Sequence, residues 1–400
     1  MKMINLLKTP HFAALLSILL SQLHITGALS DQGHPRSSHS PGRITVNQGF
    51  YNNSDGSPLL RLIDSASHSI DIEVYTMQDP AVRASLRGAL KNKVRVRVVQ
   101  EASPVGAACK IFSTGAGTAE CADLRALVKE VKAKGGQYVP FNKSNLCGIP
   151  GKPCFQHGKL VIVDSQTALL STGNFDATNL CDQAAHPSRC NRDYSYVTLN
   201  SQLVTALRSI FEHDLVGKSY DLRQFIPSPL ATQLTVSPFS LVPLVNFIAS
   251  AKTSIEIENQ YLKELTINAA LIKAAKKGLN VRVTVSSVCA FGKPTSTRAA
   301  QWASDNRKFE AAGIHIRIFD KKIQVNGHPG YLHAKGIVVD GKRGWLGSVN
   351  GSTTSTSSNR EFGIFFNDPT SVRTLEGILH SDETNPDGET WQQSLSCAKG

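Results

Sequence analysis

The chain has 400 residues and a formal charge of +12 at pH 7. This length exceeds the usual size of one hydrophobic core, so it predicts two domains or one large one. The positive charge predicts an anionic partner, but Lys and Arg are scattered and nowhere form the block that is typical of a basic arm. Nucleic acid and anionic lipid surfaces both remain open as partners.

Residues 1–30 have the pattern of a signal peptide. Lys2 and Lys8 give a basic start, a short apolar run follows, and small residues precede a predicted cleavage site before Asp31. The run is too short to span a bilayer core of about 30 Å, and no later segment approaches the ~20 apolar residues that a spanning helix needs. We therefore expect a soluble, secreted or periplasmic protein. Removal of the two lysines, with no acidic residue lost, leaves a charge of +10.

Eight cysteines support the prediction of export, because an even number can pair in an oxidising compartment. Six of them bracket three short loops rich in Gly, Pro, Asn or Ser, and the other two are left as a long-range pair. The sequence alone leaves the connectivity open, since eight cysteines allow on the order of a hundred pairings. A zinc site is disfavoured because no C-x-x-C repeats and no cysteine keeps ligand spacing to a histidine. The candidate pairs are Cys109 with Cys121, Cys147 with Cys154, Cys181 with Cys190, and Cys289 with Cys397.

The chain contains an internal repeat, because the twenty residues from Pro58 align without a gap with the twenty from Pro243. Each copy predicts an amphipathic helix, an alternating strand, a second helix and an apolar-basic strand. These elements cover residues 58–65, 70–75, 81–92 and 94–99 in the first copy, and 243–250, 255–260, 267–278 and 281–285 in the second.

Strands that alternate with helices indicate an α/β sandwich with a mainly parallel or mixed sheet. Duplication of the whole unit predicts two similar α/β sandwich domains related by a pseudo-two-fold axis. A linker is placed at residues 31–43, the first domain at residues 44–225 and the second at residues 226–400.

A histidine and a lysine recur at the same place in both copies. HGKLVIVD starts at His157 and HAKGIVVD starts at His333, so Lys159 and Lys335 follow two residues later. Residues i and i+2 of a strand point to the same face, so each histidine should project together with its lysine. An isolated histidine near apolar residues is usually structural, but a His-Lys pair that repeats in register favours a functional site.

Further polar residues follow each motif. STGN ends at Asn174, and GSVN contains Ser348 and ends at Asn350, so amides and hydroxyls are available to a ligand. The tripeptides NRD and NRE then supply Asp193 and Glu361. With the carboxylate at the end of each motif, each copy supplies a histidine, a lysine, an asparagine and two carboxylates.

These residue types suit displacement at phosphorus. Two lysines and two asparagines can hold a phosphate, while one neutral imidazole attacks and the other, protonated, donates to the departing alkoxide. A carboxylate on the far ring nitrogen would fix each tautomer, which suits Asp193 and Glu361. The scheme needs no metal or other cofactor, and neither H-E-x-x-H nor a calcium loop occurs. We therefore predict one active site that needs both copies, with His157 and His333 close to a common phosphate position.

H-x-K-x-x-x-x-D followed by G-S-x-N, present twice, resembles the phospholipase D superfamily over nearly all of the chain beyond residue 30. The resemblance implies phosphodiester cleavage through a phosphohistidine intermediate at the interface of two similar α/β domains. Either His157 or His333 would be the nucleophile and the other the general acid, and the resemblance favours His157 as the nucleophile. It implies phosphate binding by Lys159, Lys335, Asn174, Asn350 and Ser348, support of the surrounding architecture by Asp164 and Asp340, and orientation of the histidines by Asp193 and Glu361.

The first copy departs from the superfamily pattern. STGN replaces the usual GSxN, and Asp193 stands where Glu is commoner, after an insertion, CDQAAHPSRC, that the second copy lacks. We interpret these departures as drift and specialisation, and a degenerate first site is the alternative. We predict that a Cys181–Cys190 bridge closes the insertion beside the mouth of the active site.

The leading prediction for function is a secreted phospholipase D, a monomer that meets lipid at a membrane surface and hydrolyses phosphatidyl headgroups or transfers them to an alcohol. A secreted endonuclease of the same superfamily is the alternative, because phosphate contacts dominate nucleic-acid affinity and suit a basic protein. A membrane-bound phospholipid synthase is disfavoured by the absence of predicted spanning segments. A non-catalytic binder of anionic surfaces is the third hypothesis.

Overall fold

In the computed structural model, the described residues are 46–53, 58–105, 109–112, 117–149, 151–182, 184–186, 188–290, 292–320 and 322–398. They belong to one compact unit. The predicted signal peptide at residues 1–30 and the linker at residues 31–43 lie outside the described residues.

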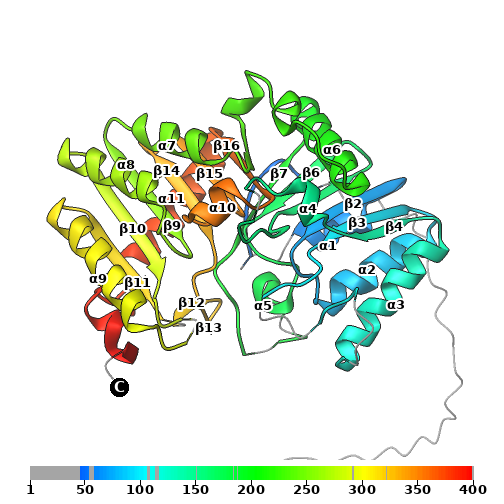
Figure 1. The fold of residues 1–400 in the computed structure, drawn as a ribbon, viewed down its shortest axis with the longest axis horizontal. Coiled ribbons are helices and arrows are strands. Elements are labelled where there is room, and N and C mark those ends of the chain that lie inside the picture. Colours follow the sequence, from blue (N-terminus) through cyan, green and yellow to red (C-terminus); the bar gives the residue numbers. More distant parts are fainter. Residues whose placement is uncertain are drawn as a thin grey trace, which may run out of the picture. The chain divides into compact units, whose positions relative to one another are not determined.

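The first half of the described chain forms a mixed sheet of seven strands with helices (Figure 1). Its strands are β1 (Gly49–Asn52), β2 (Ser69–Val74), β3 (Arg95–Gln100), β4 (Gln137–Pro140), β5 (Lys159–Val163), β6 (Thr167–Ser171) and β7 (Tyr194–Thr198). Its helices are α1 (Pro58–Asp64), α2 (Pro80–Lys91), α3 (Ala119–Ala133), α4 (Lys143–Leu146), α5 (Ala177–Leu180) and α6 (Ser201–Val216). The strand order is β1-β7-β6-β5-β2-β3-β4, in which β2, β3 and β4 are parallel and the other neighbours are antiparallel.

The second half of the described chain repeats this arrangement (Figure 1). Its main sheet contains β8 (Leu234–Ser237), β9 (Ser254–Asn259), β10 (Asn280–Ser286), β11 (His315–Phe319), β14 (Lys335–Val339), β15 (Arg343–Gly347) and β16 (Glu361–Phe366). Its helices are α7 (Leu241–Ala249), α8 (Leu265–Lys276), α9 (Ser296–Ala311), α10 (Thr353–Ser357) and α11 (Pro369–Thr384). The order β8-β16-β15-β14-β9-β10-β11 matches that of the first sheet strand for strand. A hairpin of β12 (Ile323–Val325) and β13 (His328–Gly330) precedes β14.

The predicted duplication of an α/β unit is therefore confirmed. The predicted helices and strands of both copies agree with α1, β2, α2 and β3, and with α7, β9, α8 and β10. The boundary that we predicted between residues 225 and 226 falls in the connection from α6 to β8. That connection contains short 3-10 turns at Leu222–Phe225 and Leu230–Thr232.

The motif strands begin later than we predicted. They start at Lys159 and Lys335, so His157 and His333 lie before the regular ladder. Each of these lead-in segments instead makes a single bridge to the opposite half of the molecule, Gln156 to Arg360 and Leu332 to Arg192. The prediction of a strand from the histidine onward was wrong. The segment before each histidine pairs with the opposite half of the molecule, and the local pattern of polar and apolar residues cannot indicate such a long-range pairing.

The three large apolar clusters of the described residues include one that spans both halves. One cluster joins the first sheet to α1, α2 and α3, and a second joins the other sheet to α7, α8 and α9. The third contains inward-facing residues of both sheets together with α6 and α11, for example Leu160, Leu207, Phe362 and Leu375. Because burial of apolar surface is the main force in folding, this shared core makes the interface between the halves part of the fold.

All four candidate cysteine pairs form disulfides in the structure. They join Cys109 to Cys121, Cys147 to Cys154, Cys181 to Cys190 and Cys289 to Cys397. The three short loops and the long-range pair that the sequence suggested are therefore all closed by disulfides.

Candidate active site

Each histidine is held by an acid from the opposite half of the molecule. His157 Nδ1 lies 2.8 Å from Glu361 Oε2, and His333 Nδ1 lies 2.9 Å from Asp193 Oδ1. A carboxylate accepts, so Nδ1 carries the proton in both rings and Nε2 is left for chemistry. The sequence predicted that these acids orient the histidines, but it did not predict that the acids are exchanged between the halves.

Backbone pairing produces this exchange. The His157 N–H donates to the Arg360 carbonyl at 2.9 Å, and the His333 N–H donates to the Arg192 carbonyl at 3.2 Å. Each histidine thus sits beside the residue that immediately precedes the other half's acid. The two arrangements are equivalent, as pseudo-two-fold symmetry requires.

The two motif lysines are completely buried between the halves. Lys159 and Lys335 are each 0% exposed, and each ammonium donates to the carbonyl of its own motif histidine. Burial lowers the pKa of Lys159 to about 7, an effect that Glu361 opposes and the charge of Lys335 reinforces. Burial likewise lowers the pKa of Lys335 to about 8. The charge of Lys335 acts on Lys159, which agrees with the crossed histidine–acid pairs that bring the two motifs into one site.

The pKa values of both imidazoles and of both acids are lowered, which favours neutral histidines and ionised carboxylates. Burial lowers the pKa of His333 to about 4 although Asp193 opposes this shift, and burial lowers the pKa of His157 although Glu361 opposes it. The pKa of each acid is lowered, because its histidine and a nearby lysine outweigh the effect of burial. Both imidazoles are therefore neutral near pH 7 in the empty site, and both acids are ionised.

The asparagines that we predicted to bind phosphate have unused polar atoms. The side-chain oxygens of Asn174 and Asn350 are buried and have no hydrogen-bond partner among the described residues. Unpaired buried polar atoms are unusual and call for a ligand or a water. Ser348 differs, because its hydroxyl accepts from the Phe362 N–H at 3.0 Å and lies 3.3 Å from the Phe362 carbonyl. These hydrogen bonds fix the backbone of the strand at the residue after Glu361. A role of Ser348 in phosphate binding stays a prediction.

Asp164 and Asp340 lie at the far ends of the motif strands from the histidines. Asp164 accepts from the backbone N–H groups of Ser67, His68 and Ser69 at 2.7–2.9 Å. Asp340 accepts in the same way from the three residues that lead into β9, Lys252, Thr253 and Ser254. Both carboxylates therefore fix the starts of the central strands β2 and β9, which agrees with the supporting role that the resemblance implied.

Several residues of the site were missed from the sequence. The ring of Tyr75 lies 5.0 Å from that of His157, and the ring of Tyr331 lies 5.7 Å from that of His333. Tyr75 is the last residue of the repeated strand pattern, and Tyr331 stands two residues before His333. These positions were the only sign in the sequence that the two tyrosines belong to the site. Each tyrosine packs edge-on against a histidine and limits the orientation of that ring.

The arginines of NRD and NRE form ion pairs that the sequence did not predict. Arg192 donates to Asp382 at 2.7 and 2.8 Å, and Arg360 donates to Asp214 at 2.6 and 3.0 Å. Both pairs are buried and both cross between the halves. Each arginine thereby anchors the segment that carries the neighbouring acid of the site.

Two further searches of the described residues bear on the predictions. Within the ranges given above, no group of three or more His, Cys, Asp or Glu side chains is arranged to hold a metal ion. Among the same residues, none of the helices combines the length and the apolar composition needed to cross a bilayer.

Comparison with known proteins identifies the family. The profile of the family described as "Cardiolipin synthase, PLD-like domain" matches residues 59–215 and 244–382, and the chain belongs to this family of the phospholipase D superfamily. The predicted resemblance is thus confirmed.

Named relatives and a solved structure are consistent with this family. The chain is 24% identical over 342 residues to a probable cardiolipin synthase of Bacillus subtilis, a match that covers 81% of this chain and 63% of that protein. It is 26% identical over 243 residues to cardiolipin synthase A of Pseudomonas putida, covering 56% and 47%. The chain therefore spans about three fifths or less of the curated relatives named here. The fold is similar to that of phosphatidylserine synthase from Haemophilus influenzae, with a TM-score of 0.59, 14% identity and coverage of 85% and 86%.

The lowered pKa values of the lysines predict a pH dependence of anion binding. A lysine is charged below its pKa, so the positive charge of this pair is lost as the pH rises through about 7 and about 8. We expect the affinity for sulfate, whose own charge is constant, to fall about tenfold or more between about pH 6 and about pH 9. Isothermal titration calorimetry would measure this change. Lys159→Met should weaken binding at low pH and flatten the profile, whereas an affinity that is constant with pH in the unaltered protein would contradict the prediction.

Proposed function

We propose that the protein is a secreted or periplasmic phosphodiesterase that cleaves phospholipid headgroups through a phosphohistidine intermediate. The reciprocal pairing of each histidine with the acid of the other half carries this proposal. It brings two oriented imidazoles into one site with two buried lysines, and these groups suit displacement at phosphorus. The predicted signal peptide and the four disulfides support the proposed location, since disulfides persist in oxidising compartments.

The reaction proceeds in two displacements. His157 Nε2 attacks phosphorus as the bond to the leaving oxygen breaks, and protonated His333 gives its proton to that oxygen. Water or an alcohol then loses a proton to His333 as its oxygen attacks phosphorus, and the phosphorus–nitrogen bond to His157 breaks. Lys159 and Lys335 balance the charge on the phosphoryl oxygens throughout.

Protonation of His333 follows from substrate binding. In the empty site its pKa is lowered to about 4, mainly by burial, so the ring is neutral. A phosphodiester anion placed beside the ring favours the imidazolium, because an opposite charge at close range raises the pKa of a base. Binding of substrate should therefore take up a proton and create the general acid where it is needed.

The relatives named above favour lipid as the substrate. The named relatives are cardiolipin synthases, which supports transfer of a phosphatidyl group to an alcohol as well as hydrolysis.

A parallel assay tests this proposal. The purified protein, with chelator present, is incubated with phosphatidylcholine vesicles, phosphatidylglycerol vesicles and plasmid DNA, each with and without a primary alcohol. We expect release or exchange of headgroups and intact plasmid. Nicked plasmid with intact lipid would instead establish the endonuclease, which the charge of +10 expected after signal-peptide removal suits equally well. Binding of vesicles without turnover of any substrate would establish the non-catalytic binder.

A further inference from the structure

The acids of the two halves differ in length by one methylene group, and their partners differ in the opposite sense. Asn179 Nδ2 donates to Asp193 Oδ2 at 2.7 Å and lies 3.3 Å from His333 Nδ1. At the matching place in the second half, five residues after Asn350, the hydroxyl of Ser355 donates to Glu361. Each acid also accepts from a second side chain, Asp193 Oδ1 from the Thr172 hydroxyl at 2.7 Å and Glu361 Oε1 from Asn359 Nδ2 at 2.9 Å. At the position five residues after each motif asparagine, the short acid is thus paired with the longer donor and the long acid with the shorter donor.

The backbone at Gly173 lies in close contact with the Asp193 side chain. A Cβ added at Gly173 would lie 2.7 Å from Asp193 Cγ and 2.8 Å from Oδ2, a separation that atoms do not adopt. The second half has Val349 at the matching position, so only the first half needs a glycine there. The glycine of STGN therefore leaves room for Asp193, and Thr172, which stands where the superfamily pattern has Ser, donates its hydroxyl to Asp193 Oδ1 at 2.7 Å.

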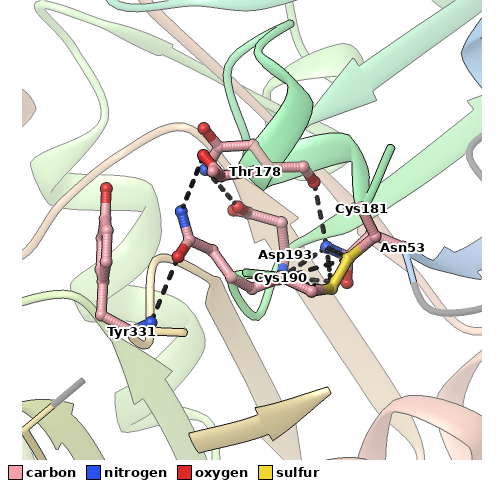
Figure 2. The surroundings of a disulfide bond; sticks show 8 residues. Asn53, Thr178, Cys181, Cys190, Asp193 and Tyr331 are labelled. Atoms are coloured by element: carbon pink, nitrogen blue, oxygen red, sulfur yellow. Dashed lines mark hydrogen bonds between the residues drawn. A yellow bond between two sulfur atoms is a disulfide. The ribbon is translucent and has the colours of Figure 1, made fainter. Parts of the chain in front are cut away.

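Asn53 and the Cys181–Cys190 disulfide lie together next to Asp193 (Figure 2), and they hold Asn179 in place. Asn53 Nδ2 donates to the carbonyls of Asn179 at 2.9 Å and Asn191 at 2.7 Å, and the Asp193 N–H donates to Asn53 Oδ1 at 3.3 Å. The disulfide joins Cys181, two residues beyond Asn179, to Cys190, three residues before Asp193. The donor and the acid thus lie on two segments that one cross-link ties together.

We propose that Asn179 is a positioning residue for the Asp193–His333 pair, and that Asn53 and the Cys181–Cys190 disulfide fix Asn179 in that role. This inference rests on the proposed function, because it gives the first half its own means of orienting the proposed general acid. The insertion CDQAAHPSRC then serves the chemistry of His333 as well as any access to the site.

A double-mutant cycle tests the compensation between acid and donor. Asn179→Ser and Asp193→Glu should each lower kcat on phosphatidylglycerol vesicles roughly ten- to a hundredfold, because each misplaces a group by about 1 Å. The double variant copies the Ser355–Glu361 pair and should recover most of this loss, so the effects should be strongly non-additive. Turnover of bis(4-nitrophenyl) phosphate should change less, because its good leaving group departs without help from a general acid. Additive losses, or equal losses on both substrates, would overturn the inference.

A spectroscopic signal gives a test that does not depend on turnover. In protein labelled with ¹⁵N-histidine, the His333 Nδ1 proton that Asp193 accepts should give a slowly exchanging low-field signal, assigned by its absence in His333→Ala. The signal should be lost or shifted in Asn179→Ser and restored in the double variant. Absence of turnover in the unaltered protein would refute the proposed function and leave this signal as the test of positioning. An unchanged signal in Asn179→Ser would overturn the inference alone.

The disulfide has a matched control in the second half. Cys181→Ser/Cys190→Ser removes a cross-link that spans 9 residues, whereas Cys289→Ser/Cys397→Ser removes one that spans 108. Chain entropy predicts that the second variant loses more thermal stability, since longer closed loops contribute more. The inference predicts that Cys181→Ser/Cys190→Ser loses more of its kcat on phosphatidylglycerol than Cys289→Ser/Cys397→Ser, both measured well below their melting temperatures. This comparison also tests the inference if Asn179→Ser fails to fold. Loss of activity that merely follows loss of stability would contradict it.

Discussion

His333→Ala should accumulate an acid-labile phosphoenzyme from a nitrophenyl phosphodiester, whereas His157→Ala should form none. Both variants should lose turnover of phospholipid by about 10³-fold or more, because each lacks one partner of the proton and phosphoryl transfers. They differ in the first step with a good leaving group, which departs without protonation. His333→Ala retains the nucleophile but lacks the base that activates water, so the intermediate forms and then persists.

Acid quenching and detection of phosphate on the denatured protein would measure this intermediate. His315→Ala is a suitable control, because His315 is exposed on the edge strand β11 and should leave turnover unchanged. The opposite pattern would reverse the roles of the two histidines. A phosphoenzyme in both variants would refute the idea of one dedicated nucleophile.

Arg360→Ala should lower the free energy of unfolding by about 3–5 kcal/mol, the usual effect of breaking a buried ion pair from one side. The Arg360 side chain is 2% exposed, and it donates to both oxygens of Asp214 and to the Ser237 carbonyl at 2.8 Å. Its removal leaves the Asp214 carboxylate buried without its ion-pair partner in the interface between the halves. Arg192→Ala should have an effect of similar size, because Arg192 holds Asp382 in the equivalent way.

Urea unfolding followed by circular dichroism would measure these differences. Arg208→Ala is the control, since Arg208 is 44% exposed and lies 3.7 Å from Glu212. Surface pairs of this kind contribute about 1 kcal/mol or less. If Arg360→Ala were no more destabilising than Arg208→Ala, the crossed arginine pairs would have no special part in holding the halves together.

The pattern of the sequence was sufficient to predict the architecture. The helix beginning at Pro58 and the strand after it repeat from Pro243 with the same spacing, and local periodicity alone identifies such elements. The motifs at His157 and His333 also needed only local spacing to be found. Spacing along the chain also suggested the candidate cysteine pairs, but the sequence left their connectivity open and the structure decided it.

The detailed site could not be predicted in the same way. Glu361 lies 204 residues from His157, and Asp193 lies 140 residues from His333, yet these are the pairs that form. The strand expected to start at each histidine instead turns to pair with the opposite half. The motif that predicted phosphate binding by Ser348 gave no sign of the hydrogen bonds between its hydroxyl and the backbone of Phe362, and the phosphate role stays a prediction. None of these partners has a periodic or local signature.

The sequence by itself determined the family, the duplicated α/β fold and the residue types gathered at the site, because each of these depends on spacing or composition along the chain. Only the tertiary structure decided which acid serves which histidine, that Arg192 and Arg360 bind the halves together, and that Asn179 matches the shorter Asp193. The physical reason is that these contacts depend on how two sheets pack across a shared apolar core. Packing of that kind brings together groups more than a hundred residues apart and selects partners by fractions of an ångström.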